Sequence, residues 1–351
     1  MSPGAAPHYG ARMVQRAGLL ALVVCGFSAS AAQAMVVAIT DNSVAVSDSG
    51  SEANVVSITR TGDTITVRDT AVAPTEDEDA CMQSPDDTSA VVCTVPNAVL
   101  SSVYLGGGAN TLTMAGIGSD YVYGGDEVDQ ITGSELKDII VGAGGNDRID
   151  GGGGPDQIDG GAGDDELEGG PGDDFFWNNT GADIFKDTGG GRDSVSYVNN
   201  TADAAGVEIS LDGVANDGNI TEDRGMDNVG AGIEHVQGSR FADEIQGGPG
   251  DDSLSGAEGN DTLVGNGGVD TFNGAEGDDR IEARDGAADG PEINCDNSMG
   301  SHGTADVAVL DAADPEPANC ESVDRAAAPG PEVIASEDTT VKSKMPNVVG
   351  K

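Results

Sequence analysis

The chain has 351 residues, of which 62 are acidic and 16 basic, so its formal net charge is −46 and its isoelectric point lies near 4.1. A charge of this sign excludes a general affinity for nucleic acid or for an anionic membrane, and it makes cations the natural partners. Aromatic residues are only 3% of the chain and glycine supplies 54 residues, which favours a solenoid with a thin internal stack over a thick globular core.

Residues 1–34 are predicted to be a secretory signal peptide. Arg12 and Arg16 precede the apolar run 17–27, and Ala32-Gln33-Ala34 has the small-x-small pattern of a cleavage site. We therefore expect the mature chain to start at Met35, to be secreted into the extracellular space and not to insert into a membrane. A single membrane anchor is the alternative, although the apolar run is short for a bilayer span.

Residues 35–104 are predicted to form a small β-rich N-terminal module. Polar and apolar side chains alternate in Ser57-Ile58-Thr59 and in Thr64-Ile65-Thr66-Val67, with Thr61-Gly62-Asp63 as a turn between them.

Four cysteines of the expected mature chain point to two disulfides in a secreted protein. Cys81 and Cys93 lie in the N-terminal module, and Cys295 and Cys320 lie near the other end. Three connectivities are open, and we expect local pairing, Cys81 with Cys93 and Cys295 with Cys320. A metal-binding or nucleophilic role for these cysteines is the alternative.

A nine-residue repeat organises residues 105–196. An Asp recurs at every ninth position, an apolar residue follows two positions after each Asp, and glycines cluster before it. The aspartates are Asp120, Asp129, Asp138, Asp147, Asp156, Asp165, Asp174 and Asp183, and the apolar residues are Val122, Ile131, Ile140, Ile149, Ile158, Leu167, Phe176 and Phe185. A triplet with one apolar residue at its centre predicts a very short strand with that side chain inward. Two units then make one coil of a parallel β-structure, so equivalent turns are expected to stack every eighteen residues.

The glycine-rich turns between these strands are predicted to bind calcium. Glycine permits positive φ and close backbone approach, so several carbonyls can turn inward beside the Asp carboxylate. Hard oxygen ligands in an irregular shell suit Ca²⁺ better than Mg²⁺ or Zn²⁺. An ion could bridge stacked aspartates such as Asp147 and Asp165, or Asp156 and Asp174. The expected ligands in this block are Gly142, Gly145, Asp147, Gly151, Gly152, Gly154, Asp156, Gly160, Gly161, Gly163, Asp165, Gly169, Gly170, Gly172, Asp174 and Asp183.

The period is lost in an interlude, residues 197–237, and returns in a second block, residues 238–282. The interlude contains one predicted strand, 207–211, and an acidic loop, 212–227, which is either a solvated connector or a further calcium loop. The expected ligands of the second block are Asp243, Gly247, Gly248, Gly250, Asp252, Gly256, Gly259, Asp261, Gly265, Gly268, Asp270, Gly274, Gly277 and Asp279. Asp252 is expected to share an ion with Asp270, and Asp261 with Asp279.

Several copies depart from the pattern. Turns 124–129 and 133–138 lack the fourth glycine, and turn 178–183 lacks the first two. These turns either bind calcium or stack without an ion, and both interpretations are open. Acidic residues at the fifth position (Asp164, Asp173, Asp251 and Asp278) are open in the same way, as ligands or as solvating groups.

The chain is expected to end in a disulfide-stapled cap, residues 283–325, and a disordered tail, residues 326–351.

The pattern G-G-x-G-x-D-x-U-x is clearest at 151–156, 160–165 and 169–174, and it resembles the RTX, or hemolysin-type, calcium-binding repeat. The resemblance implies a parallel β-roll in which stacked turns share each calcium ion. The order of the parts is also similar to that of secreted actinobacterial calcium-binding repeat proteins.

Catalytic motifs were sought and not found in the sequence. It has no His-Glu-x-x-His, no Gly-x-Ser-x-Gly and no Walker phosphate loop, and after residue 34 its histidines are His235 and His302. We therefore expect a non-catalytic, calcium-stiffened extracellular or surface module. One alternative is a calcium-dependent adhesin or binding protein whose partner binds at 35–104 or at the interlude. The sequence does not identify that partner. The other is an RTX-type hydrolase or toxin.

Overall fold

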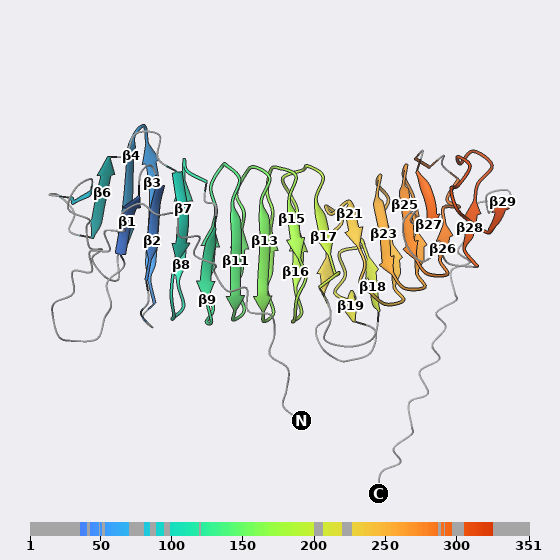
Figure 1. The fold of residues 1–351 in the computed structure, drawn as a ribbon, viewed down its shortest axis with the longest axis horizontal. Coiled ribbons are helices and arrows are strands. Elements are labelled where there is room, and N and C mark those ends of the chain that lie inside the picture. The colour runs from blue at the N-terminus through green and yellow to red at the C-terminus, as the bar shows by residue number, and fades with distance from the viewer. Residues whose placement is uncertain are drawn as a thin grey trace, which may run out of the picture. The chain divides into compact units, whose positions relative to one another are not determined.

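The computed structural model describes residues 36–40, 43–48, 50, 53–69, 81–84, 89–94, 99–118, 121–199, 206–219, 227–286, 289–290, 292–296 and 305–325. Their secondary-structure elements are all β-strands, β1 to β29 (Figure 1). None of these residues forms a helix long and apolar enough to cross a membrane. The predicted signal peptide, the predicted tail, Asp120 and His302 lie outside the described residues.

One long sheet, here called sheet A, runs through both repeat blocks. Its strands, in spatial order, are β1 (Val36–Thr40), β2 (Ser43–Ser47), β7 (Val99–Tyr104), β9 (Val122–Gly125), β11 (Ile139–Gly144), β13 (Gln157–Ala162), β15 (Phe175–Trp177), β17 (Ser194–Ser196), β21 (His235–Gln237), β23 (Ser253–Glu258), β25 (Thr271–Glu276) and β27 (Ile293–Asp296). Strands β17 and β21 pair directly, with Val195 opposite Val236. The interlude therefore does not interrupt this sheet.

The opposite strand of each coil belongs to one of two further sheets. Sheet B contains, in order, β20 (Asn228–Val229), β16 (Ile184–Lys186), β14 (Glu166–Glu168), β12 (Arg148–Asp150), β10 (Gln130–Thr132), β8 (Thr111–Ala115), β3 (Val55–Thr61), β4 (Thr64–Asp69), β6 (Ala90–Thr94) and β5 (Cys81–Gln83). Sheet C contains β19 (Gly218–Asn219), β18 (Val207–Ser210), β22 (Glu244–Gln246), β24 (Thr262–Val264), β26 (Arg280–Glu282), β28 (Val307–Leu310) and β29 (Ser322–Arg325). The break between sheets B and C falls at the interlude.

Pairing between successive coils is parallel and follows the predicted spacing. Ile131 lies opposite Ile149, which lies opposite Leu167, and the same eighteen-residue step relates Ile140 to Ile158 in sheet A. Between the glycine-rich turns, β10, β12, β14 and β16 of sheet B and β22, β24 and β26 of sheet C have three residues each, whereas several strands of sheet A extend to six. The predicted all-β parallel solenoid is confirmed.

The core is a thin stack of single apolar side chains. Ile149, Ile158 and Leu167 are 1%, 0% and 1% exposed, while the residues beside them in each strand face outward. The inward orientation predicted for these three side chains is confirmed. Larger side chains fill the same stack near the interlude, where Phe185 packs edge-on against Phe176 and against the fully buried Tyr197.

The N-terminal region joins the same stack. Strand β2 pairs in parallel with β7, and β3 pairs in parallel with β8, so they form a further coil. Antiparallel strands extend both sheets at this end. Strand β1 pairs with β2 at the edge of sheet A, and β4, β6 and β5 follow β3 in sheet B. Cys93 is disulfide-bonded, and its backbone lies opposite that of Cys81.

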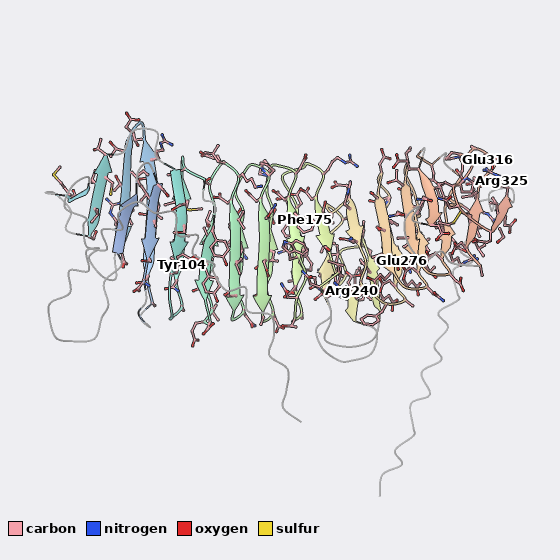
Figure 2. All side chains as sticks on the ribbon, in the orientation of Figure 1. Tyr104, Phe175, Arg240, Glu276, Glu316 and Arg325 are labelled. Atoms are coloured by element: carbon pink, nitrogen blue, oxygen red, sulfur yellow. A yellow bond between two sulfur atoms is a disulfide. The ribbon has the colours of Figure 1, made fainter. Side chains whose placement is uncertain are left out.

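The C-terminal cap contains the expected disulfide between Cys295 and Cys320. The Arg325 guanidinium donates to the carbonyl oxygens of Asp311 (3.0 Å) and Pro315 (2.8 Å) and lies 3.4 Å from the Glu316 carboxylate (Figure 2). The disulfide links β27 to the loop before β29, and Arg325 ties β29 to the same loop.

Candidate metal centre

The repeat aspartates form columns in which each carboxylate is hydrogen-bonded to the coil before it. The Oδ1 atom of Asp156 accepts from the backbone N–H of Asp138, and the Oδ1 atom of Asp174 accepts from the N–H of Asp156, each at 2.7 Å. The opposite column contains the same bond from Asp147 N–H to Asp165, also at 2.7 Å. In the second block the bonds from Asp252 to Asp270 and from Asp261 to Asp279 are each 2.9 Å. The structure therefore stacks all four pairs of aspartates that were expected to share an ion.

The second carboxylate oxygen is left over in most of these residues. It is buried and has no hydrogen-bond partner among the described residues in Asp129, Asp147, Asp156, Asp165, Asp174, Asp193, Asp261, Asp270, Asp279, Asp289 and Asp306. A buried carboxylate oxygen without a partner is costly, and native structures rarely leave one so. An unpaired buried carboxylate oxygen that recurs from coil to coil indicates a site for a cation that coordinates oxygen atoms.

The first glycine of each turn makes the space beside that oxygen. A Cβ atom added to Gly151 would lie 2.6 Å from Asp156 Oδ2 and 2.9 Å from the carbonyl oxygen of Gly169 in the next coil. At Gly142 an added Cβ atom would meet Asp147 Oδ2 and, at 2.6 Å, the carbonyl oxygen of Gly160 in the next coil. Oxygen atoms of two stacked turns thus converge where a larger residue would place carbon, and such a donor set fits Ca²⁺.

The second and fourth positions of most turns have a left-handed backbone. Gly152 and Gly154 have φ of 96° and 99°, and Ala143 adopts 88° at the second position of its turn. Glycine reaches this region without strain, whereas alanine is strained there. Among the predicted ligand glycines at these two positions, those that lack this conformation are Gly172, Gly248 and Gly250.

The columns are electrostatically unfavourable without a cation. Burial raises the pKa of Asp156 to about 8, and the carboxylates of Asp174 and Asp138 add to the shift against the lowering effect of the Asp138 N–H. Burial likewise raises the pKa of Asp147 to about 7 and that of Asp261 to about 8, each with two column neighbours contributing. A bound cation would favour the ionised carboxylates and reverse this effect.

Two turns satisfy their Asp from within the protein. In turn 133–138 the Ser134 N–H (2.8 Å) and hydroxyl (3.0 Å) both donate to Asp138 Oδ2. In turn 238–243 the Ser239 N–H donates to Asp243 Oδ2 (2.6 Å) and its hydroxyl to Oδ1 (2.7 Å). We call these the serine-capped turns. Asp243, expected as a ligand, therefore has serine partners for both of its oxygens.

The other irregular turns differ from one another. Turn 124–129 keeps the unpaired Oδ2 on Asp129, so it resembles the glycine-rich turns despite lacking the fourth glycine. In turn 178–183 the unpaired buried oxygen belongs to the Asn178 amide. In turn 247–252 the Gly248 N–H donates to Asp252 Oδ2 at 2.7 Å, so this predicted ligand already has one partner.

Side chains at the fifth position form a second, exposed ladder. The Asn146 carboxamide oxygen accepts from the Asp164 N–H (3.1 Å), and Asp164 Oδ1 accepts from the Ala182 N–H (3.0 Å). Asp173 and Asp251 accept from the next coil in the same way. The sequence did not predict that these side chains accept a hydrogen bond, because it shows the acidic residue but not which backbone N–H of the next coil lies beside it.

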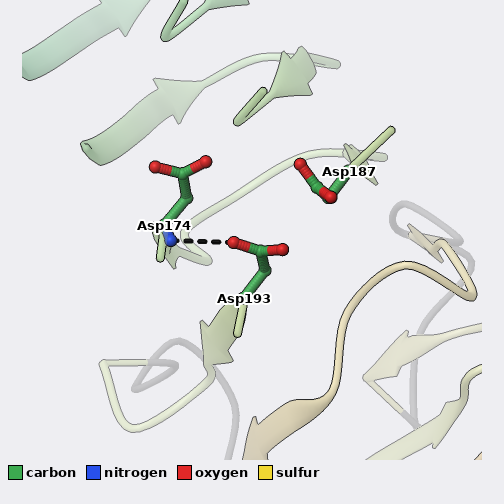
Figure 3. Close-up of side chains that lie close together, drawn as sticks. All are labelled: Asp174, Asp187 and Asp193. Carbon is green, nitrogen blue, oxygen red and sulfur yellow. Dashed lines mark hydrogen bonds between the residues drawn. The ribbon is translucent and has the colours of Figure 1, made fainter. Parts of the chain in front are cut away.

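A cluster at the end of the first block includes residues that the sequence did not single out as ligands. One carboxylate oxygen from each of Asp174, Asp187 and Asp193 lies within 4.8 Å of the others (Figure 3). Asp193 Oδ1 accepts from the Asp174 N–H at 2.8 Å, and Asp187 accepts from the Gly190 N–H at 2.8 Å. Asp193 lies nineteen residues after Asp174 rather than eighteen, because turn 187–193 has one extra residue.

The ends of the acidic interlude loop are structural. Asp217 accepts from the N–H groups of Ser210 (2.6 Å) and Val229 (2.8 Å). Asp227 accepts from the Asp183 N–H (2.9 Å) and the Tyr197 hydroxyl (3.1 Å). These two carboxylates therefore hydrogen-bond neighbouring coils to one another where the regular repeat turn is missing.

The fold is a parallel β-solenoid, so the chain is a repeat protein. Its turns bring carboxylate and carbonyl oxygens together, and this donor set suits a hard divalent cation. The family model of the RTX calcium-binding nonapeptide repeat, which itself spans four copies of the repeat, matches residues 104–140, 123–158, 132–165, 150–185, 229–263 and 264–287. The chain therefore carries RTX calcium-binding nonapeptide repeats, as the sequence pattern predicted. A comparison of the chain with curated proteins gave no match.

Proposed function

We propose that the chain is a secreted, non-catalytic calcium-binding β-roll protein that folds on Ca²⁺ and serves as an extracellular or surface structural module. The observation that carries the proposal is the repeated buried Oδ2 atom without a partner, beside a glycine and facing the next coil's carbonyl. In the two serine-capped turns the serine N–H donates to the corresponding Oδ2, which supports the interpretation that the turns with an unpaired Oδ2 need an ion.

The ions would be held by aspartates of stacked turns and by carbonyls of the glycines between them. The pairs Asp147 with Asp165, Asp156 with Asp174, Asp252 with Asp270 and Asp261 with Asp279 supply the carboxylates. When bound, calcium supplies positive charge at a place where the protein concentrates negative charge, and its binding free energy adds to folding.

Secretion fits this chemistry. Extracellular calcium modules commonly bind at ~10⁻⁴ to 10⁻³ M, a range that keeps the turns empty inside a cell. A chain of net charge −46 with a thin core would then stay unfolded before export and fold outside.

Circular dichroism of the full chain during a Ca²⁺ titration tests the proposal. We expect a disordered spectrum in EDTA and a cooperative gain of β signal as calcium rises, with no such gain in the same concentration of Mg²⁺. A β spectrum in EDTA that calcium leaves unchanged would refute coupled folding.

A binding protein or adhesin is the second candidate, and one surface favours it. The outer face of sheet A carries Tyr104, Tyr121 and Tyr123 in mutual ring contact, and Phe175 packs on Trp177 further along (Figure 2). Aromatic side chains are enriched at protein interfaces, and the chain has few of them, so this grouping on one face favours a partner-binding site. A pulldown from the native secretome would test it, and a hydrolase panel on the purified chain would test the hydrolase or toxin alternative.

A further inference from the structure

A second kind of acidic cluster lies in the C-terminal cap, outside the matched repeats, which end at residue 287. Asp296 is the last residue of β27, Asp306 immediately precedes β28, and Glu321 immediately precedes β29. One carboxylate oxygen from each lies within 4.8 Å of the other two. Two oxygens bound to one Ca²⁺ at its usual distances lie at most about 5 Å apart, so the three can reach a common ion.

The unsatisfied atom of this cluster is on Asp306. This residue is 0% exposed, and its Oδ2 has no hydrogen-bond partner among the described residues. Its Oδ1 accepts from the Asp279 N–H at 2.6 Å, so Asp306 continues the column of the second block. Burial raises the pKa of Asp306 to about 6, and the nearby Glu321 and Asp296 carboxylates act in the same direction.

The disulfide places the other two acids. Asp296 follows Cys295 and Glu321 follows Cys320, and the bond between these cysteines brings the two Cα atoms to 5.2 Å. Glu321 also accepts from the Asp306 N–H at 2.9 Å. Two segments 25 residues apart are thus fixed covalently so that both acids face Asp306.

The arginines of the described cap have carboxylate partners elsewhere. Arg284 lies 3.5 Å from Asp324, and Arg325 lies 3.4 Å from Glu316. The three-carboxylate cluster therefore gathers negative charge around Asp306 Oδ2, which is buried and has no hydrogen-bond partner among the described residues. A hard divalent cation would supply the missing charge.

We propose that Asp296, Asp306 and Glu321 form a cap site for a divalent cation of the Ca²⁺ type, which fastens the disulfide-bonded cap to the last coil. The site differs from the repeat turns because its ligands are three carboxylates rather than one carboxylate per turn with glycine carbonyls. It goes beyond the proposed function, since it lies in a segment with no repeat.

The test is the number of calcium ions bound by the full chain, measured by equilibrium dialysis and metal analysis. Glu321→Gln keeps the shape and the acceptor for the Asp306 N–H, and Asp306→Asn keeps the acceptor for Asp279. Each should lose one ion per chain relative to the wild type. Glu292→Gln, an exposed acid beside the same strand, is the matched control and should lose none.

Reduction of the disulfide gives a second readout. Calcium should slow the release of the Cys295 and Cys320 thiols by dithiothreitol in the wild type and in Glu292→Gln, and slow it less in Glu321→Gln. Wild-type calcium content in both Glu321→Gln and Asp306→Asn would overturn the cap site while leaving the repeat sites standing. A wild type that binds no calcium would refute the proposed function and the cap site together.

Discussion

Turns 133–138 and 151–156 lie in the same column, one coil apart, and they satisfy the same buried carboxylate in different ways. Asp138 Oδ2 receives the N–H and the hydroxyl of Ser134, whereas Asp156 Oδ2 faces the space beside Gly151 and has no partner among the described residues. The strands, the register and the Oδ1 bond are common to both. The two turns thus treat the second oxygen differently: Ser134 donates to it in one turn, and in the other it remains available to an ion.

The second block repeats the comparison. Ser239 contacts Asp243, while Asp261 in the next coil of that column keeps an unpaired Oδ2 beside Gly256. Ser134 and Ser239 stand at the second position of their turns, where turns 151–156 and 256–261 have Gly152 and Ala257. We infer that the residue at this position, rather than the place of the turn in the stack, decides whether an ion is required. Turn 247–252 is intermediate, because the Gly248 N–H donates to Asp252 Oδ2 without a serine.

A carboxylate placed where neither serine nor ion can reach it gives the largest expected effect. Ile158→Asp buries an unpaired acid in the core stack and should lower the free energy of unfolding by several kcal/mol. The exposed neighbouring change, Gln157→Asp, should stay within ~0.5 kcal/mol. Denaturant unfolding in saturating Ca²⁺ compares the two, and equal stabilities would mean that the two faces of β13 are assigned wrongly.

Removing the carboxylate of a glycine-rich turn should remove calcium. Asp156→Ala deletes the unpaired oxygen and the acceptor of the Asp138 N–H, so bound calcium per chain should fall while the β signal of the second block remains. The matched control is Asp126→Ala, which removes an exposed acid of another turn. An unchanged calcium content in Asp156→Ala would contradict the shared-ion pairing.

Acidification should stabilise the metal-free chain. Burial raises the pKa of Asp147, Asp156 and Asp261 from the ordinary value to between about 7 and about 8, so the folded state binds more protons than the unfolded state in this range. The contribution of these three groups to the stability of the folded state is then fully present below their unfolded-state pKa, and it is lost as pH rises through their folded-state pKa values. Circular dichroism in EDTA should therefore show more β signal near pH 5 than near pH 8, where the metal-free chain is expected to be disordered.

The opposite trend is expected for calcium binding, because protons compete for the same oxygens and affinity should fall on acidification. A β signal in EDTA that grows from acid to neutral pH would show that the carboxylates are not buried as the columns require.

Removing a serine cap should give the smallest effect. Ser134→Ala leaves Asp138 Oδ2 with one donor and should cost about 1.5 to 3 kcal/mol, the range of a hydrogen bond to a charged group. Denaturant unfolding in saturating Ca²⁺ measures the loss, and calcium content should not change. Ser253→Ala, on the outer face of β23, is the control and should be neutral. A loss of bound calcium in Ser134→Ala would place an ion at a turn that we assign to serine.

The sequence predicted the repeat geometry well because one residue type marks each role. The nine-residue spacing of Asp and the apolar residue two positions later sufficed for the coil, the eighteen-residue stacking step and the inward side chains. The spacing of Asp306, 27 residues after Asp279, is three periods, so it too carried a signal that could have extended the column into the cap.

Other features depend on distances that the sequence does not carry. Alternation at 55–61 predicts a strand but not whether its neighbour is parallel, so the coil of β2 and β3 was not foreseen. The pairing of β17 with β21 across the interlude and the reach of Ser134 to Asp138 are likewise set by the folded backbone. The predicted assignment of individual glycines and aspartates as ligands stays a prediction until calcium is measured.

Hydrogen exchange of the full chain, in EDTA and in millimolar Ca²⁺, tests the central claim that the unpaired carboxylates make folding depend on calcium. We predict that residues 142–177, which contain four glycine-rich turns, are strongly protected in calcium and exchange freely in EDTA. Strong protection of that segment in EDTA would show that the roll folds without metal. The account of the two kinds of turn would then be contradicted, even if calcium still binds.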